Sequence, residues 1–357
     1  MKSTKTIPQY EPLFNRKRLK QLMNEYLSTD GWMTEHKLTK QFEDLLAKEL
    51  GVKYCHVVNN GTISLSLALL AMGVKAGDIV LVPTLSMIAT ASAVSFIGAK
   101  PKFVEINTNL CMNYSDTVIA IKKYKPKAVL FVSLNGRVGD GIKIEAYCRK
   151  RKIALIEDAA QSFGSDTTNA KIKSYSFSMP KIITTGQGGA LVTNNEKISK
   201  IIRHLKDFGR ETGGNDKHDY YGINSKFTEL QAVLGIEQMD NIKQRIKRKK
   251  EIYSLYKKEL NEVVNFVTTD LNKVTPWFID IIAEKRDELI EYLKKEDINT
   301  RKIYPSMCSQ KIYKIKKKYP ITTYYTNRGL WLPSSLTLSD NQIRYICNKI
   351  KEFYGKV

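Results

Sequence analysis

The feature that most constrains this chain is a regular alternation of short apolar runs with segments of helical periodicity. In order, DIVLVP precedes a helical ATASAVSFIG, KPKFVEI and KAVLFVSL have the pattern of strands, and a helical IKIEAYCRKRK precedes the strand-like KIALIED. Strands rich in β-branched residues that alternate with helices are typical of a mostly parallel sheet covered by helices. The sequence therefore predicts an α/β fold.

A chain of 357 residues exceeds one average domain, so a second, smaller domain is expected. No repeat or low-complexity linker marks the boundary, and we place it near residue 240. Residues 1–240 would form the large domain, with an N-terminal arm. Residues 241–357, with helices and a strand at Trp277–Ile282, would form a smaller C-terminal α+β domain.

The net charge of +22, from 58 Lys and Arg against 36 Asp and Glu, raises the hypothesis of nucleic-acid binding. The densest basic stretch, Asn241–Leu260, also carries Ile242, Ile252 and Tyr256 at helical spacings. That pattern is typical of the solvated face of a packed helix. No RNA-recognition or zinc-finger signature accompanies it, so nucleic acid is not the expected partner, and anionic small substrates explain part of the charge.

No apolar run approaches the roughly 20 residues that span a bilayer, and the first residues lack the apolar segment of a secretory signal. The five cysteines are scattered without CxxC spacing, and the four histidines show no metal-ligand spacing. We therefore expect a cytoplasmic protein with free thiols, no membrane partner and no metal site.

The segment SFSMPKIITTGQGG places Lys181 between small polar residues and a glycine-rich turn. A lysine amine held in a pocket can form a Schiff base with an aldehyde cofactor, and the glycines let the backbone approach a flat ring or a phosphate. The alternative is an ordinary solvated lysine.

The run KIALIEDAAQSFGS is expected to be a buried strand that ends at Asp158. Sites in α/β sheets lie at the carboxyl ends of strands, and a carboxylate there can pair with a pyridinium nitrogen that acts as an electron sink. The alternative is that Asp158 caps a following helix.

The segment VVNNGTISLSLALL combines a strand, a glycine turn and a helix whose first turn offers the amides of Gly61, Thr62 and Ile63. Unpaired N–H groups and the helix dipole make such a terminus a phosphate-binding site. Ordinary turn chemistry is the alternative.

Together and in this order, these three segments resemble the nucleotide-sugar aminotransferases, a family of fold-type I pyridoxal-phosphate enzymes. The resemblance spans almost the whole chain and includes GWMT, VPTLSMIATASAV, GINSKFTELQAVLG, PWFIDI and GLWLPSSLTLSDNQIRYICNKIKEFY. It implies a large cofactor-binding domain with a mostly parallel central sheet flanked by helices, plus the smaller C-terminal α+β domain.

The resemblance also implies the roles of individual residues. Lys181 would form the Schiff base with pyridoxal 5'-phosphate and Asp158 would pair with the ring nitrogen, and these two are the expected catalytic residues. Asn224 would reach the phosphate from a partner subunit, so that a homodimer with shared active sites is the catalytic unit. The full set of implied cofactor contacts is Gly61, Thr62, Met87, Asp158, Gln161, Ser176, Lys181 and Asn224.

Two positions depart from the family pattern. Met87 stands where the family often has an aromatic residue stacked on the cofactor ring, and Lys226 stands where it often has an arginine. A methionine sulfur can still cover a ring, and plain core filling is the alternative. Lys226 keeps the positive charge but loses the bidentate fork of an arginine.

The segments that resemble the family's substrate pocket contain seven implied substrate contacts: Trp32, Asn135, Arg137, Lys226, Trp277, Arg301 and Tyr304. Two of these have a specific structural alternative. Trp277, beside Pro276, would be a core residue, and Arg301 would brace a helix end.

The implied reaction is transamination of a nucleotide-linked keto-deoxysugar with glutamate as amino donor, through pyridoxamine phosphate. The segments PWFIDI and TRKIYPSM most resemble 4-aminotransferases of the perosamine synthase type, so we expect a 4-keto-6-deoxyhexose as substrate. The alternatives are a 3-keto sugar aminotransferase and a non-catalytic regulator that binds pyridoxal phosphate.

Overall fold

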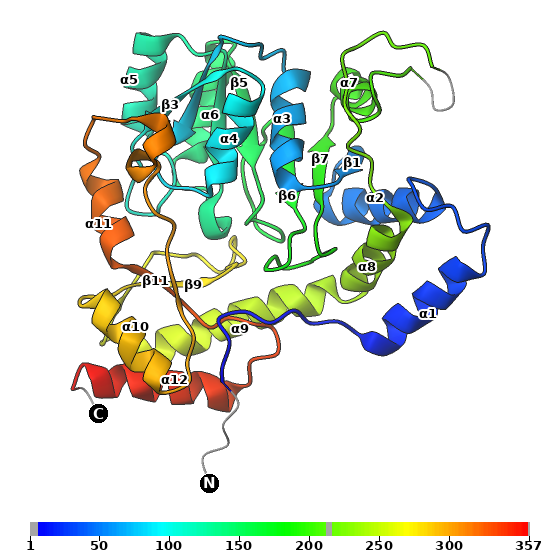
Figure 1. The fold of residues 1–357 in the computed structure, drawn as a ribbon. Coiled ribbons are helices and arrows are strands. Elements are labelled where there is room, and N and C mark those ends of the chain that lie inside the picture. Colours follow the sequence, from blue (N-terminus) through cyan, green and yellow to red (C-terminus); the bar gives the residue numbers. More distant parts are fainter. Residues whose placement is uncertain (1–5, 212–215, 356–357) are drawn as a thin grey trace.

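The computed structural model describes residues 6–211 and 216–355, and its centre is a seven-stranded sheet (Figure 1). The strand order is β1-β7-β6-β5-β4-β2-β3, with β7 antiparallel to β1 and β6 and all other neighbouring pairs parallel. The strands are Tyr54–Val58 (β1), Ile79–Pro83 (β2), Lys100–Val104 (β3), Ala128–Val132 (β4), Ala154–Asp158 (β5), Ile172–Ser176 (β6) and Gly189–Thr193 (β7). The predicted mostly parallel sheet is confirmed.

Helices cover both faces of this sheet, which explains why its strands are continuous apolar runs. Ala128 and Leu130 of β4 face the core shared with α3, α4 and α7, whereas Val129 and Phe131 face α5 and α6. The helices are Lys37–Leu50 (α2), Gly61–Ala71 (α3), Ile88–Phe96 (α4), Tyr114–Tyr124 (α5), Gly141–Lys150 (α6), Glu196–Lys206 (α7) and Glu229–Asp240 (α8), with Arg16–Leu27 (α1) packed on α8.

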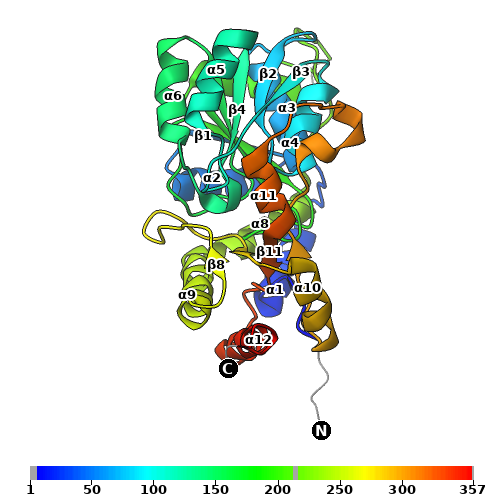
Figure 2. The ribbon, with the colours of Figure 1, turned by 90° about the vertical axis from the view of Figure 1, so that its left-hand side faces the viewer.

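A second, antiparallel sheet lies below the first in the view of Figure 1, with strand order β10-β11-β9-β8. Its strands are Asn265–Phe266 (β8), Ile279–Ile282 (β9), Arg301–Lys302 (β10) and Gly329–Leu332 (β11), and the chain around it forms Ile242–Leu260 (α9), Arg286–Lys295 (α10), Pro320–Arg328 (α11) and Asp340–Phe353 (α12). Figure 2 shows the same arrangement from the side, with α9 and α12 at the far end from the large sheet.

The strand predicted from Trp277 begins only at Ile279, because the N–H of Phe278 donates to the Asn135 side chain (2.7 Å) instead of joining the ladder. The predicted boundary at residue 240 falls at the junction of α8 and α9. Although the N-terminal segment belongs to residues 1–240, it also packs on the second sheet, because Ile7 pairs with Ile298 and lies in the core of that sheet. The division into two domains stays a prediction.

The basic helix α9 is amphipathic as predicted, with Ile252 and Tyr256 buried. The expectation that its basic residues form a solvated face is wrong for two of them, because Arg245 and Lys249 are buried as well. Within residues 6–211 and 216–355, no helix is both long and apolar enough to cross a membrane.

Candidate active site

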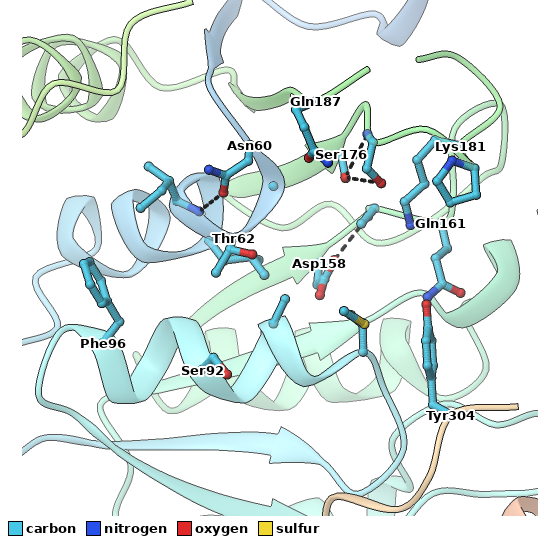
Figure 3. A pocket seen from close by; sticks show the side chains of 18 of the residues that line it. Asn60, Thr62, Ser92, Phe96, Asp158, Gln161, Ser176, Lys181, Gln187 and Tyr304 are labelled. Atoms are coloured by element: carbon cyan, nitrogen blue, oxygen red, sulfur yellow. Dashed lines mark hydrogen bonds between the residues drawn. The ribbon is translucent and has the colours of Figure 1, made fainter. Parts of the chain in front are cut away.

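A cavity of about 1140 Å³ opens beside the carboxyl end of β5 and the N-terminus of α3. Figure 3 shows Lys181, Asp158 and Gln161 around its space, with Tyr304 on one side and Thr62 and Ser176 on the other. Ten of the residues predicted from sequence line this cavity: Gly61, Thr62, Met87, Asp158, Gln161, Ser176, Lys181, Trp277, Arg301 and Tyr304.

Lys181 follows β6 in a turn that its own N–H closes onto the carbonyl of Ser178 (3.0 Å). Its amine lies over the indole ring of Trp277, 4.0 Å from the ring centroid, so it is not a solvated surface lysine. Burial lowers the pKa of Lys181 to about 8, although the charge of Asp158 acts in the opposite direction. An amine with this pKa is partly neutral near pH 7 and can act as a nucleophile or a base.

Asp158 is the last residue of β5, and it is buried. Thr90 donates its hydroxyl to one carboxylate oxygen (2.7 Å), and the N–H of Ala160 donates to the other (3.2 Å). Burial raises the pKa of Asp158, while both hydrogen bonds stabilise the charged form. The helix-cap alternative is wrong, because the next regular element after β5 is the strand β6.

The turn between β1 and α3 forms a cradle for an anion. Asn60 caps α3 by accepting a hydrogen bond from the N–H of Ile63 (2.9 Å), which leaves the amides of Gly61 and Thr62 at the cavity wall. A Cβ added at Gly61 would lie 2.8 Å from the Cβ of Ser176, so a larger residue would displace the Ser176 side chain. An amine, a buried carboxylate and an anion cradle in one cavity are the groups that pyridoxal phosphate requires, and the cofactor fits these residues.

Met87 precedes α4 and lines the cavity with 44% of its surface exposed. The alternative that it fills the core is therefore wrong, and whether it covers the cofactor ring stays a prediction. Arg301 lies on β10, where its guanidinium stands over the rings of Tyr304 (5.7 Å) and Trp331 (5.5 Å). It does not brace a helix end.

Trp277 is 1% exposed, which agrees with the alternative that it is a core residue, but it also lines the cavity. Its indole N–H is used within the protein, where it donates to the carbonyl of Pro180 (2.5 Å).

Asn135 and Arg137 lie outside this cavity, contrary to the expectation that they contact substrate. Arg137 is 2% exposed and forms a bidentate ion pair with Asp280, with N–O distances of 2.8 and 2.6 Å. The Asn135 side chain donates to the carbonyl of Phe278 (2.8 Å), and its backbone N–H donates to Gln161 (2.9 Å). Both residues join the two sheets, and their polar groups are used within the protein.

Trp32, Asn224 and Lys226 also lie outside the cavity. Trp32 and Lys226 line a separate hollow of about 700 Å³, and Lys226 forms an ion pair with Asp207 (2.8 Å). Asn224 is exposed and accepts a hydrogen bond from the N–H of Lys226 (3.3 Å). The structure does not bring these three residues to the cavity, and the role of Asn224 in the site of a partner subunit stays a prediction.

Four residues that the sequence analysis did not select belong to the site. Asn60 and Gln187 line the cavity, Thr90 holds Asp158, and the hydroxyl of Tyr10 donates to the carbonyl of Lys181 (3.3 Å). The capping rule could have found Asn60, which stands directly before the helix. Thr90 and Tyr10 are remote in sequence from the residues they hold. Among the residues the structure describes, no group of three His, Cys, Asp or Glu side chains could hold a metal ion.

The fold and the cavity together define a fold-type I aminotransferase, and comparison with known proteins agrees. The model of the DegT/DnrJ/EryC1/StrS aminotransferase family matches residues 15–351, and the chain belongs to this family. It is a pyridoxal-phosphate-dependent aminotransferase.

Among its relatives, GDP-perosamine synthase of Escherichia coli O157:H7 is 36% identical over 98% of this chain and 99% of that protein. GDP-perosamine synthase of Vibrio cholerae is 32% identical over the same shares. A DegT/DnrJ/EryC1/StrS aminotransferase from Brucella abortus has a similar crystal structure, with a TM-score of 0.89 at 26% identity over 95% of this chain and 96% of that one. The resemblance to perosamine synthases inferred from the motifs is confirmed.

Proposed function

We propose that this enzyme transfers the amino group of glutamate to a nucleotide-linked 4-keto-6-deoxyhexose and forms a 4-amino-4,6-dideoxy sugar nucleotide. The full-length similarity to two GDP-perosamine synthases carries this proposal. Another relative, from Saccharopolyspora spinosa, is named a 4-aminotransferase of a dTDP-linked 4-dehydro sugar. The cavity supports the chemistry, because Lys181, Asp158 and the anion cradle converge there.

A 3-keto sugar is the second candidate substrate. A relative from Pseudomonas aeruginosa, 28% identical over 86% of this chain, is named for a UDP-linked 3-oxo sugar acid. A catalytically silent regulator is a poorer explanation, since Lys181 and Asp158 are both present and both line the cavity.

Pyridoxal phosphate, when bound, supplies a carrier for the amino group and an acceptor for the electron pair released at the reacting carbon. In the first half-reaction the amine of Lys181 would move the proton from Cα of the amino donor to the cofactor, and in the second it would move a proton from the cofactor to the sugar carbon that receives the amino group. The Asp158 carboxylate, held by Thr90, would stabilise a protonated ring nitrogen. The amides of Gly61 and Thr62 would bind the phosphate.

The rim of the cavity fits an anionic substrate. Arg301 is exposed on β10 and presents its guanidinium beside Tyr304. A guanidinium recognises carboxylates and phosphates by paired hydrogen bonds. We infer that Arg301 binds either the donor carboxylate or the diphosphate of the sugar nucleotide.

We also propose that the working enzyme is a homodimer in which each chain completes the other's cavity through Asn224. Large apolar side chains are exposed on the same loop, among them Phe208, Tyr220, Tyr221 and Ile223, and Trp32 is exposed as well. Exposed apolar groups of this size mark protein–protein contacts.

The experiment uses the purified enzyme with [¹⁵N]glutamate and a panel of 4-keto-6-deoxy and 3-keto sugars linked to GDP, dTDP or UDP. We expect ¹⁵N to appear in a 4-amino sugar nucleotide, detected by mass spectrometry and placed at C4 by NMR. Faster amination of a 3-keto sugar would overturn the choice of carbon. Absence of ¹⁵N from every sugar would contradict the proposed function.

A further inference from the structure

Two aromatic side chains hold the backbone on both sides of Lys181. The indole N–H of Trp277 donates to the carbonyl of Pro180 (2.5 Å), and the hydroxyl of Tyr10 donates to the carbonyl of Lys181 itself (3.3 Å). The two donors come from distant parts of the chain, with Trp277 just before β9 and Tyr10 in the N-terminal segment. The backbone on both sides of Lys181 is therefore held by residues that do not belong to the turn around the lysine.

The ring of Trp277 also contacts the amine directly. Lys181 Nζ lies 4.0 Å from the ring centroid. A cation over the face of an indole is attracted by the negative potential of the ring, and the attraction is stronger for indole than for a phenyl ring. The contact therefore favours the ammonium form of Lys181, whereas burial favours the neutral amine.

Trp277 has little freedom to leave this position. The amine of Lys249, from α9, donates to the carbonyl of Trp277 (2.9 Å) and to the carbonyl of Ser334 (2.6 Å). The indole stacks on Phe278 at 3.8 Å between ring centroids and meets Trp331 edge-on at 5.6 Å. A ring fixed on several sides can hold a neighbouring peptide in one place.

Two charged groups act on Lys181 from other elements. Asp158 at the end of β5 raises the pKa of the amine, and Arg301 on β10 lowers it, while burial has the largest effect and lowers it to about 8. A substitution that leaves burial, Asp158 and Arg301 in place isolates the contribution of the indole.

We propose that Trp277 is a positioning residue for Lys181, whose indole N–H fixes the peptide before the lysine and whose ring holds the amine and favours its ammonium form, with Tyr10 fixing the carbonyl after it. This role replaces the substrate contact expected for Trp277, since its N–H is already used. The proposal rests on the reactive role of Lys181 in the proposed function.

The first test measures the pKa of Lys181 in the full-length chain after removal of the cofactor, by trace acetylation at a series of pH values and mass spectrometry of its peptide. Trp277→Phe keeps a buried ring but removes the indole, and we expect the pKa to fall by about 0.5 unit. Tyr256→Phe is the control. Like Trp277→Phe it removes a buried donor to a backbone carbonyl, here that of Pro333 (3.0 Å), and leaves a phenyl ring, but Tyr256 does not line the cavity, so it should leave the pKa unchanged.

The second test follows hydrogen exchange of the peptide that contains Lys181. Tyr10→Phe removes only one oxygen, and we expect faster exchange there with an unchanged pKa of the amine. Tyr345→Phe is the control, because its exposed hydroxyl donates to Glu296 away from the cavity (3.4 Å). This test remains decisive if Trp277→Phe does not fold.

An unchanged pKa in Trp277→Phe, or an equal fall in Tyr256→Phe, would overturn the role of the indole. Unchanged exchange in Tyr10→Phe would overturn the role of the hydroxyl. Both readouts need neither cofactor nor sugar, so their failure is distinguishable from a failure of the proposed function.

Discussion

The substitution Asp158→Asn removes one charge from the floor of the cavity with little change in shape. An asparagine oxygen can still accept the hydroxyl of Thr90, which now lies 2.7 Å from the carboxylate. The fold should therefore survive, and the melting temperature should stay close to that of the parent. The variant loses the negative charge that raises the pKa of Lys181 and that we propose stabilises a protonated ring nitrogen.

A hydrogen bond to a charged group contributes about 1.5–3 kcal/mol, which corresponds to a loss of about 10-fold to 160-fold in kcat/KM. Thr90→Val is the matched comparison, because it removes the hydroxyl that holds Asp158 but keeps the charge. Thr90 acts on the reaction only through Asp158, whose other oxygen is still held by the N–H of Ala160, so this variant should lose only about 2-fold to 10-fold, or about 0.5–1.5 kcal/mol.

The assay is steady-state kinetics on the preferred sugar ketone, with the cofactor content of each variant determined from its absorbance. We expect Asp158→Asn to bind the cofactor and to be much slower than Thr90→Val. Equal kcat/KM in Asp158→Asn and the parent would refute the assignment of Asp158 to the ring nitrogen.

Three further predictions concern the ion pair, the buried lysine and the second subunit. Arg137→Met leaves Asp280 buried and unpaired and should cost about 3–5 kcal/mol in urea unfolding, most of which the added Asp280→Leu should restore. A higher KM with unchanged stability would instead make Arg137 a substrate contact. Burial lowers the pKa of Lys249 to about 7 from 10.5, so the folded chain binds one proton fewer than the unfolded chain between these values. The stability of the parent relative to Lys249→Met should therefore rise with pH there by about 1.4 kcal/mol per unit, and a flat difference would contradict this pKa. Co-expression of Asn224→Ala with Lys181→Ala should restore partial activity, because a mixed dimer contains one intact cavity, whereas mixed dimers without activity would show that each chain completes its own.

The fold was predictable because the strands that build the large sheet are buried on both faces. A strand such as Ala128–Val132 is then a continuous apolar run, which the sequence shows directly. Asp158 and Lys181 could be selected for a similar reason, since each lies in a local segment whose pattern points to a strand end or a turn. The alternative that Asp158 caps a helix depended on which element follows β5, and the structure shows a strand there. The alternative that Lys181 is solvated depended on the packing around the amine, and the structure excludes it as well.

The neighbours of these residues could not be predicted, because they are brought together only by tertiary packing. Arg137 and its partner Asp280 are 143 residues apart, and no local pattern marks the pair. The N–H of Trp277 reaches a carbonyl 97 residues away, so its contact with the lysine turn is visible only when the second sheet is docked on the first. Trp32, Asn224 and Lys226 do not line the cavity, and the contribution of Asn224 to the site of a second chain stays a prediction.

The central claim is that Lys181 is the lysine that holds the cofactor, and reduction with borohydride tests it most directly. Borohydride converts a Schiff base into a stable secondary amine, which marks the lysine that carried the cofactor. After digestion, mass spectrometry should find the phosphopyridoxyl group on the peptide that contains Lys181, and Lys181→Ala should yield none. A modified peptide from any other lysine, or the same yield from Lys181→Ala, would contradict the account.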